Sequence, residues 1–354
     1  NFIPSLNSNA SHSWNVGLNQ DPTTGLLRNQ TTQYSSVGVG AGFDIYKGLQ
    51  NQNTLRKANL SILAAKYQLT KMQEDVALNV ANAFLQVLFN KENLKVKQEQ
   101  KAINEKQLAR SEELVKAGSV PRGDLLDIKA TVASDAQNVI TAENALLISK
   151  LSLAQLLQLK EFYDFDVTDD SSVKDENNSL SQTPIAVYDK AKEQRTELKI
   201  AQTNLEIAEK NVAIAKGAFQ PSLQGFYNFN TRISYADTYA NQNGVVVAQP
   251  AAPFGEQFKD NRGQAFGAQL SIPIFNGWSV RNNVERNKVN LEKSKIAVEQ
   301  EELTLQRNVY TAFTDAKGGL KAYESAVSAL DARQEAYNYA KEKYAVGMMN
   351  SFDF

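Results

Sequence analysis

The feature that most constrains the fold is an internal duplication. When the sequence is shifted by 229 residues, Gly48 aligns with Gly277 and Gly118 with Gly347 without a gap. Each copy has the same order: strand, loop, strand, very long helix and turn, and a repeat of this kind governs the whole architecture. The first copy continues past its turn into further helix, whereas the second copy stops at its turn. The first copy also has no helix before its first strand, whereas the second copy does. We therefore expect a longer protein with one more helix at each end.

Composition narrows the class of protein. The 354 residues carry a formal net charge of −1, which gives no indication of a nucleic-acid partner. There is no cysteine and only one histidine, His12, so thiolate sites, disulfides and histidine clusters are excluded. We expect no catalytic residues, no metal and no cofactor, and therefore not an enzyme. No window resembles a membrane-spanning helix, but alternating strands of a membrane barrel keep mean hydropathy low.

The strands are expected to have two different faces. In Ser36–Tyr46 and in its repeat mate Ala265–Phe275, apolar residues alternate with small or polar ones, Tyr46 falling on the polar side. Two interpretations remain: a soluble sheet with one wet face, or a membrane barrel with its apolar side toward lipid. The glycines of "GVGAG" indicate packing rather than a phosphate loop, which needs a βαβ context. The residues predicted to face lipid are Val37, Val39, Phe43, Ile45, Phe266, Leu270, Ile272 and Ile274.

Two segments are too long for the helices of a globule. Residues 49–117 contain no proline or glycine, and residues 278–346 contain only the pair Gly318-Gly319. About 70 helical residues span about 105 Å, a length that indicates a coiled coil or spacer. Apolar residues repeat every seven positions in both copies, which favours supercoiled packing between helices. They are Leu55, Ile62, Leu69, Val76 and Ala83, with Val284, Leu291, Val298, Leu305 and Ala312.

The return path is predicted to match the long helix in length. Residues 123–160 and 185–217 indicate helices and 161–184 a polar, acidic linker, interpreted as a solvated connector because it lacks the spacing of a calcium loop. One long helix would run out, turn at 118–123, and two half-helices would return. Strand pairs would lie at one end and the turns about 100 Å away. The expected divisions are 1–48, 49–160, 161–184, 185–217, 218–277 and 278–354.

The ordered duplication resembles TolC-type outer-membrane factors. The resemblance covers essentially the whole chain, with a proline at strand entry (Pro4, Pro221), "IPIFNG" at strand exit and "AGSVPRGDLLDIKAT" at the turn. It implies an α+β membrane protein that forms a homotrimer, with a twelve-stranded β-barrel continued by a coiled-coil helical barrel. Four strands cannot close a barrel by themselves, so oligomerisation follows from physics, while the number three comes from the resemblance.

The resemblance also implies function, location and partners. The protein would be a passive exit duct for efflux or type I secretion, located in the bacterial outer membrane with its helical part in the periplasm. Its partners would be a periplasmic adaptor, an inner-membrane pump and outer-membrane lipid. A non-transporting coiled-coil scaffold or surface stalk is the alternative. The sequence does not identify the cargo.

The helix turns are the predicted functional sites. The resemblance implies a gate and an adaptor contact there, although a role as helix N-cap is an equal alternative for Asp124. Gly118 and Gly347 are interpreted as left-handed residues that end helices. The gate candidates are Asp124, Asp127 and Asp353. The adaptor-contact candidates are Gly118, Ser119, Val120, Gly347, Met348 and Met349.

Overall fold

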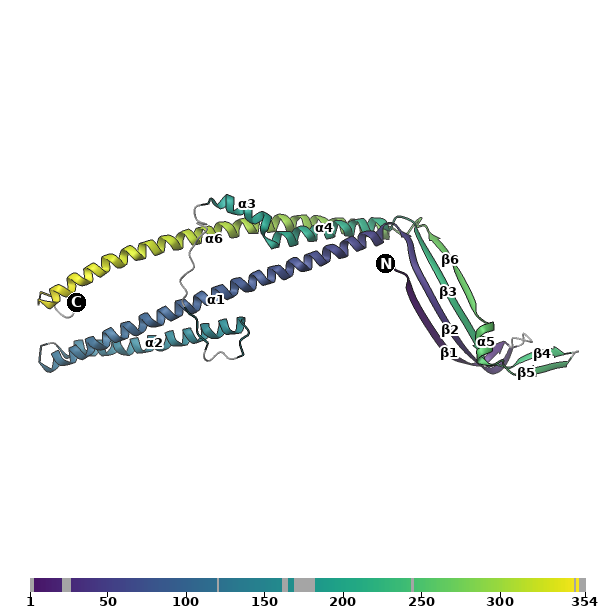
Figure 1. Ribbon diagram of the computed structural model, residues 1–354, viewed down its shortest axis with the longest axis horizontal. Coiled ribbons are helices and arrows are strands. Elements are labelled where there is room, and N and C mark those ends of the chain that lie inside the picture. Colours follow the sequence, from purple (N-terminus) through teal and green to yellow (C-terminus); the bar gives the residue numbers. More distant parts are fainter. Residues whose placement is uncertain are drawn as a thin grey trace. The chain divides into compact units, whose positions relative to one another are not determined.

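The computed structural model describes residues 3–20, 27–119, 121–160, 165–168, 182–242, 245–346 and 348–349. The order of elements follows the predicted duplication (Figure 1). Its strands and helices are β1 (Ser5–Gln20), β2 (Leu27–Lys47), α1 (Gln50–Lys116), α2 (Arg122–Leu156), α3 (Pro184–Gln194), α4 (Thr196–Gly217), β3 (Ser222–Ser234), β4 (Thr238–Gln242), β5 (Val245–Gln249), α5 (Phe254–Asp260), β6 (Gly263–Ser271) and α6 (Ser279–Ala345).

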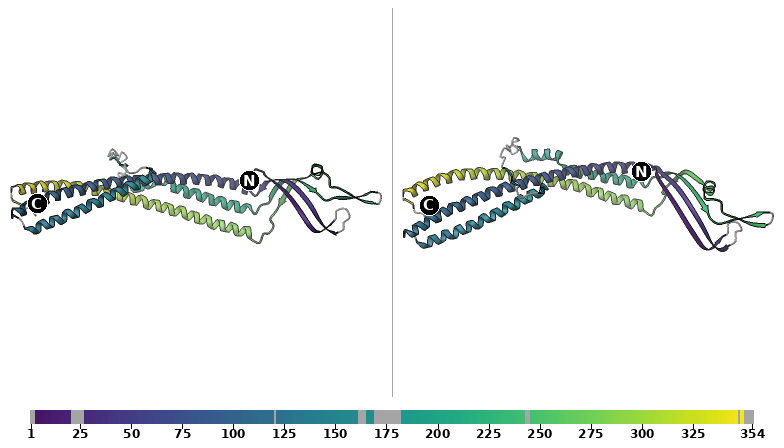
Figure 2. Two further views of the ribbon diagram at one scale, coloured as in Figure 1. Left: turned by 90° about the horizontal axis from the view of Figure 1, so that it is seen from below. Right: turned by 60° about the horizontal axis from the view of Figure 1, so that its bottom comes forward.

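The chain forms two compact units, and both long helices run from one into the other. The first unit combines Asn1–Ala64 with Ala201–Gln300 and holds the sheet. The second combines Ala65–Ile200 with Glu301–Phe354 and holds α2, α3 and most of the two long helices. Within the second unit α1 and α2 lie side by side in every view (Figures 1 and 2). None of the described helices is both long enough and apolar enough to cross a membrane.

The duplication is repeated in the backbone where each copy passes from strand to helix. Gly48 and Leu49 have φ of 55° and 58°, and their repeat mates Gly277 and Trp278 have φ of 60° and 64°. Left-handed conformation is costly for every residue except glycine, and bulky residues seldom adopt it. Two consecutive left-handed residues at equivalent positions therefore form one turn, used twice.

The long helices agree with the sequence prediction almost to the residue. Helices α1 and α6 each contain 67 residues, or about 100 Å at 1.5 Å per residue. Gly318 and Gly319 lie inside α6 without ending it. Neither segment contains a proline, so the run of backbone hydrogen bonds can continue without interruption.

The single helix predicted over 185–217 is wrong, because the chain breaks at Arg195 into α3 and α4. Arg195 has extended backbone (φ −65°, ψ 129°), and its guanidinium donates two hydrogen bonds to Glu197, at 3.1 and 2.7 Å. The next residue, Thr196, is buried and donates a hydrogen bond of 3.1 Å to Glu74 of α1. These side-chain contacts stabilise a kink that helical periodicity does not reveal.

Part of the predicted linker packs against the helices instead of being solvated. Val167 is buried with Val87 of α1 and Leu153 of α2, and Phe165 packs on the same cluster. Between them, Asp166 accepts contacts from Lys150 of α2 at 2.9 Å and Lys91 of α1 at 3.1 Å. The stretch 165–168 thus fastens α1 to α2.

Asp166 should give this contact a pH dependence. The ammonium of Lys150, then that of Lys91 and the N–H of Val167, lower the pKa of Asp166 from 3.8 to about 2. A depressed pKa contributes stability above the ordinary value of 3.8, and this is lost as pH falls through about 2. The carboxylate is half exposed, so we expect Asp166→Asn to cost only about 1 kcal/mol at pH 7.

Hydrogen exchange of the peptide containing residues 146–168 measures this effect. Protection should fall in Asp166→Asn at pH 7, and the difference from the wild type should shrink as pH approaches 2. Asp315→Asn, which removes an exposed carboxylate from α6, is the charge-matched control and should leave this peptide unchanged. Equal protection in Asp166→Asn and wild type at pH 7 would contradict the prediction.

The strands of the first unit form an antiparallel sheet in the order β1-β2-β3-β6. Its outer strands, β1 and β6, each pair on one side only among the described residues. The connection between β3 and β6 contains the β4–β5 hairpin and α5. Helix α5 covers part of β3: Thr231 donates to the carbonyl of Phe258 at 3.1 Å, and Ile233 is only 1% exposed.

Candidate functional site

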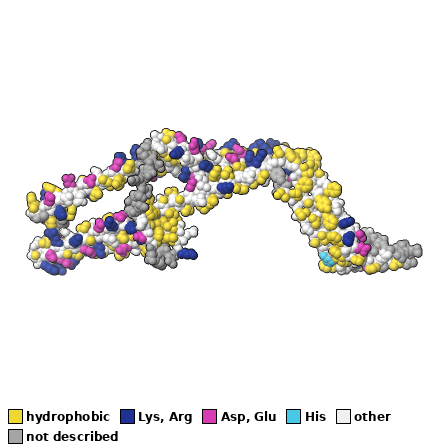
Figure 3. Space-filling view, in the orientation of Figure 1, with side chains coloured by type: hydrophobic (Ala, Val, Ile, Leu, Met, Phe, Trp, Pro, Cys, Tyr) yellow, Lys and Arg dark blue, Asp and Glu magenta, His cyan; other side chains and the backbone are white. Residues whose placement is uncertain are grey.

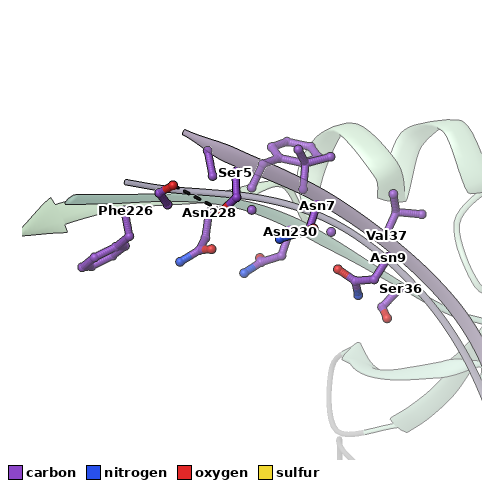
Figure 4. A pocket seen from close by; sticks show the side chains of 14 residues that line it. Ser5, Asn7, Asn9, Ser36, Val37, Phe226, Asn228 and Asn230 are labelled. Atoms are coloured by element: carbon purple, nitrogen blue, oxygen red, sulfur yellow. Dashed lines mark hydrogen bonds between the residues drawn. The ribbon is translucent and has the colours of Figure 1, made fainter. Parts of the chain in front are cut away.

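One face of the sheet is lined by asparagine, serine and glycine. Cross-strand partners share a face, and β1–β2–β3 pairing places Asn7 opposite Gly40 and Gly40 opposite Asn228. The same pattern joins Asn9, Gly38 and Asn230. Figure 4 shows Asn9, Asn228 and Asn230 on one side of the sheet and Val37 on the other. We call this side of the sheet the polar face. Its residues border a hollow of about 530 Å³.

The glycines of β2 make room for the asparagines beside them. A Cβ on Gly38 would lie 2.6 Å from Oδ1 of Asn9, and a Cβ on Gly40 would lie 3.1 Å from Oδ1 of Asn228. The packing interpretation of "GVGAG" is therefore confirmed. The result is a surface of neutral hydrogen-bonding groups that water can wet.

The opposite face is apolar, as the alternation predicts. Pairing places Val39 opposite Phe229 and Phe43 opposite Gly225, with Phe266 and Leu270 following on β6. The side chains of Phe43, Phe266 and Leu270 are exposed on this face. That this face contacts lipid remains a prediction. Figure 3 shows hydrophobic side chains gathered over the strands.

Two details of the predicted alternation need correction. A bulge at Ile45 makes Tyr46 pair with Leu223, so Tyr46 belongs to the apolar side and not the polar one, because an extra residue shifts the alternation. Strand β6 ends at Ser271, so Ile272 and Ile274 lie beyond it. Pro273, which has no N–H for the ladder, follows immediately.

The first turn ends α1 through a glycine, as predicted. Gly118 has φ of 74°, and its N–H donates to the carbonyl of Val115 at 3.0 Å. The N–H of Ser119 donates to the carbonyl of Leu114 at 2.9 Å. This pair of bonds is the Schellman motif, which caps the last carbonyls of the helix. Val120 lies outside the described residues.

The second turn repeats one of these bonds. The N–H of Met348 donates to the carbonyl of Lys343 at 2.9 Å, and both positions are 229 residues after Ser119 and Leu114. Met348 is exposed and Met349 half-buried. Gly347 and Asp353 lie outside the described residues, so their predicted roles are not located here.

Asp124 and Asp127 lie in the first two turns of α2, and both are exposed. The N-cap alternative for Asp124 is wrong: the N-cap is Pro121, without a side-chain cap bond, and Asp124 is the third residue of the helix. Its carboxylate still lies at the helix N-terminus, where negative charge is favourable.

A contact that sequence reasoning missed joins the two long helices near their turns. The guanidinium carbon of Arg110 in α1 lies 4.5 Å from the ring centroid of Tyr344 in α6. A cation over an aromatic ring contributes about 0.5–1 kcal/mol at an exposed site. No repeat or spacing in the sequence pairs these two residues.

Comparison with known protein families shows which family has this architecture. The sequence model of the family "Outer membrane efflux protein" matches residues 1–158 and 187–354. The chain belongs to this family. TolC of Vibrio cholerae serotype O1 is 23% identical over 346 residues, which are 95% of this chain and 73% of the relative.

Solved outer-membrane proteins share the fold. The outer membrane protein VceC of Vibrio cholerae superposes with a TM-score of 0.75 at 14% identity, over 99% of this chain and 79% of its own. The open MtrE channel of Neisseria gonorrhoeae gives 0.74 at 17% identity, over 99% and 73%. The predicted resemblance and the outer-membrane location are thereby confirmed, and the relatives are channels, not enzymes.

Sequence reasoning also missed an aromatic cluster where β6 leads into α6. Phe275 and Trp278 meet edge to face at 6.3 Å, and the guanidinium carbon of Arg281 lies 4.9 Å from the Trp278 ring centroid. A comparison of the two repeat copies could have identified this cluster, because the first copy has Leu49 and Gln52 where the second has Trp278 and Arg281.

Proposed function

We propose that this chain is the protomer of a trimeric exit duct in the outer membrane. Three chains each contribute four strands to one twelve-stranded barrel, continued by a coiled-coil helical barrel in the periplasm. The duct passively conducts substrates from an inner-membrane pump in a tripartite efflux or type I secretion system. The observation that carries the proposal is the two-faced sheet, polar on one side and apolar on the other, in a member of this family.

Unpaired surfaces support assembly from several copies. The one-sided pairing of β1 and β6 leaves edges that lipid does not tolerate. The heptad residues Leu55, Ile62, Leu69 and Val76 are 47–58% exposed in the single chain. This exposure is expected of a coiled-coil surface that packs against a helix of another copy. A non-transporting scaffold or stalk would need neither a lipid-type face nor a wettable one, so the duct is favoured.

The test uses the full-length protein. Purified in detergent, it should behave as a trimer, fractionate with the outer membrane and form ion-conducting pores in planar bilayers. A strain lacking it should lose export that depends on its adaptor and pump, and the intact gene should restore that export. A protein that stays soluble without detergent and gives no conductance would support the scaffold instead.

We further propose that the turns at Gly118–Ser119 and Met348–Met349, with Val120 and Gly347, contact the periplasmic adaptor, and that Asp124, Asp127 and Asp353 lie near the tunnel entrance. The exposure of Asp124 and Asp127 at the start of α2 supports this placement. Three-fold symmetry would bring like charges together, which attracts screening cations. The adaptor and pump themselves are proposed from the family resemblance.

Removing these carboxylates should weaken cation block of the channel. Two unit charges about 4 Å apart interact by ~1 kcal/mol in water, which corresponds to roughly fivefold in affinity, so removing Asp124 and Asp127 together should weaken block by divalent cations by at least this factor. Single-channel recordings of the Asp124→Ala/Asp127→Ala protein provide the measurement. Glu143→Gln, an exposed position farther along α2, is the control. Unchanged block in the double variant would remove both aspartates from the gate.

A further inference from the structure

The junction between β6 and α6 carries an exposed aromatic cluster. Ile274 is 94% exposed, Phe275 76% and Trp278 57%. With Phe219, Pro273 and Arg281 they border a cavity of about 160 Å³. A soluble surface seldom presents this many large apolar side chains together, so an exposed cluster of this kind indicates a binding surface.

The turn itself does not require these residues. The first copy builds the same left-handed pair with Gly48 and Leu49, and its residue equivalent to Arg281 is Gln52. A tryptophan in left-handed conformation is unusual, and a leucine serves equally well in the other copy. The backbone therefore does not explain why the second copy has tryptophan and arginine.

The Arg281 guanidinium and the Trp278 ring together form the polar part of this surface. The guanidinium carbon of Arg281 lies 4.9 Å from the Trp278 ring centroid. The carboxylate of Glu285, one turn along α6, interacts with the charge of Arg281 but forms its salt bridge with Lys288. A stacked guanidinium keeps a planar fork of N–H donors, which matches phosphate oxygens. Tryptophan, apolar over most of its ring with one N–H donor, is favoured where hydrocarbon meets headgroups.

The position of the cluster indicates which ligand it takes. It follows β6, whose exposed Phe266 and Leu270 belong to the apolar face, and it precedes a helix whose first turn carries Arg281. Figure 3 shows the hydrophobic side chains over the strands and Lys and Arg side chains at the adjoining helix ends. Apolar, aromatic and basic groups thus follow in the order in which a phospholipid presents acyl chain, glycerol region and phosphate.

We propose that Phe219, Phe275, Trp278 and Arg281 form a binding site for a glycerophospholipid of the periplasm-facing leaflet, with the acyl chain on the aromatic rings and the phosphate on Arg281. The site exists only in the second copy of the repeat, so a trimer carries three. The inference rests on the proposed function, since it requires the sheet to cross the outer membrane.

Tryptophan fluorescence of the full-length protein in liposomes tests the site. Trp14 is the other tryptophan of this sequence, and with every tryptophan except Trp278 changed to phenylalanine the emission reports on this junction alone. Phosphatidylcholine brominated on its acyl chains should quench Trp278 more strongly than aqueous iodide. Quenching by iodide alone, or shielding from both quenchers by a neighbouring copy, would overturn the proposal.

Mixtures of brominated phosphatidylglycerol and phosphatidylcholine test the phosphate contact. Arg281→Gln should lower the preference for the anionic lipid about fivefold, the effect expected of one basic residue at an anionic surface. The matched control is Arg286→Gln, which removes the same charge from the same helix at a side chain that contacts Asn283, and it should change the preference much less. Equal effects of the two variants would overturn the specific site.

Two further measurements separate the sources of failure. Inorganic phosphate added to protein in detergent should leave Trp278 emission unchanged, and an effect as large as that of lipid would assign the site to free phosphate instead. Conductance is recorded from the same liposomes. A conducting protein whose Trp278 is not quenched by lipid refutes only the lipid site, whereas a protein that neither inserts nor conducts refutes the proposed duct.

Discussion

Arginine in place of Phe43 should prevent efficient assembly of the sheet in the membrane. A charged side chain on the lipid face at mid-bilayer costs about 2–4 kcal/mol. Phe43 also packs over Gly225, where a Cβ would come within 2.5 Å of the ring, so this contact would be lost as well. The yield of heat-resistant trimer in the outer membrane measures the effect, and we expect it to fall strongly.

Asn7→Arg is the matched control for this variant. Asn7 lies on the polar face opposite Gly40, where the neighbouring residue has no side chain and water can solvate the guanidinium. Assembly of Asn7→Arg should remain close to that of the wild type, with altered conductance as the main change. Equal assembly of the two variants would show that the apolar face does not contact lipid.

Gly48→Ala should strongly lower the stability of the first unit. A Cβ there would lie 2.1 Å from the carbonyl oxygen of Gly217, and backbone atoms at the end of a helix cannot easily move away. The left-handed conformation, φ 55°, adds about 1–2 kcal/mol of strain to about 1–3 kcal/mol for overpacking. Thermal unfolding of the assembled protein measures the loss.

The duplication provides the control, because Gly277 occupies the equivalent turn. Its φ is 60°, but apart from its two chain neighbours no atom of the described residues lies within 4 Å of a Cβ added there. Gly277→Ala should therefore lose only the conformational part, about 1–2 kcal/mol. Gly217→Ala should lose the overpacking part, about 1–3 kcal/mol, because its Cβ would lie 2.4 Å from the carbonyl oxygen of Gly48. Equal losses in Gly48→Ala and Gly277→Ala would exclude the close backbone contact as a cause.

The sequence by itself determined the features that depend on local periodicity. The alternation in β2 assigned Val39 and Phe43 to one face and Gly40 to the other. The absence of proline gave the extent of α1 and α6 to within one residue. The shift of 229 residues aligned Gly48 with Gly277, and Gly118 was identified as a helix-ending residue. Each of these preferences is expressed by a few neighbouring residues, whatever the rest of the chain does.

Only the tertiary structure decided the features that depend on residues distant in sequence. The break at Arg195 depends on Glu74 meeting Thr196, and the fastening of α1 to α2 depends on Asp166 reaching Lys91 and Lys150. The bulge that moves Tyr46 to the apolar side is set by its pairing with β3. The aromatic cluster at Trp278 includes Phe219, which is far from it along the chain. Because such contacts add only small energies that depend on three-dimensional proximity, no periodicity in the sequence records them.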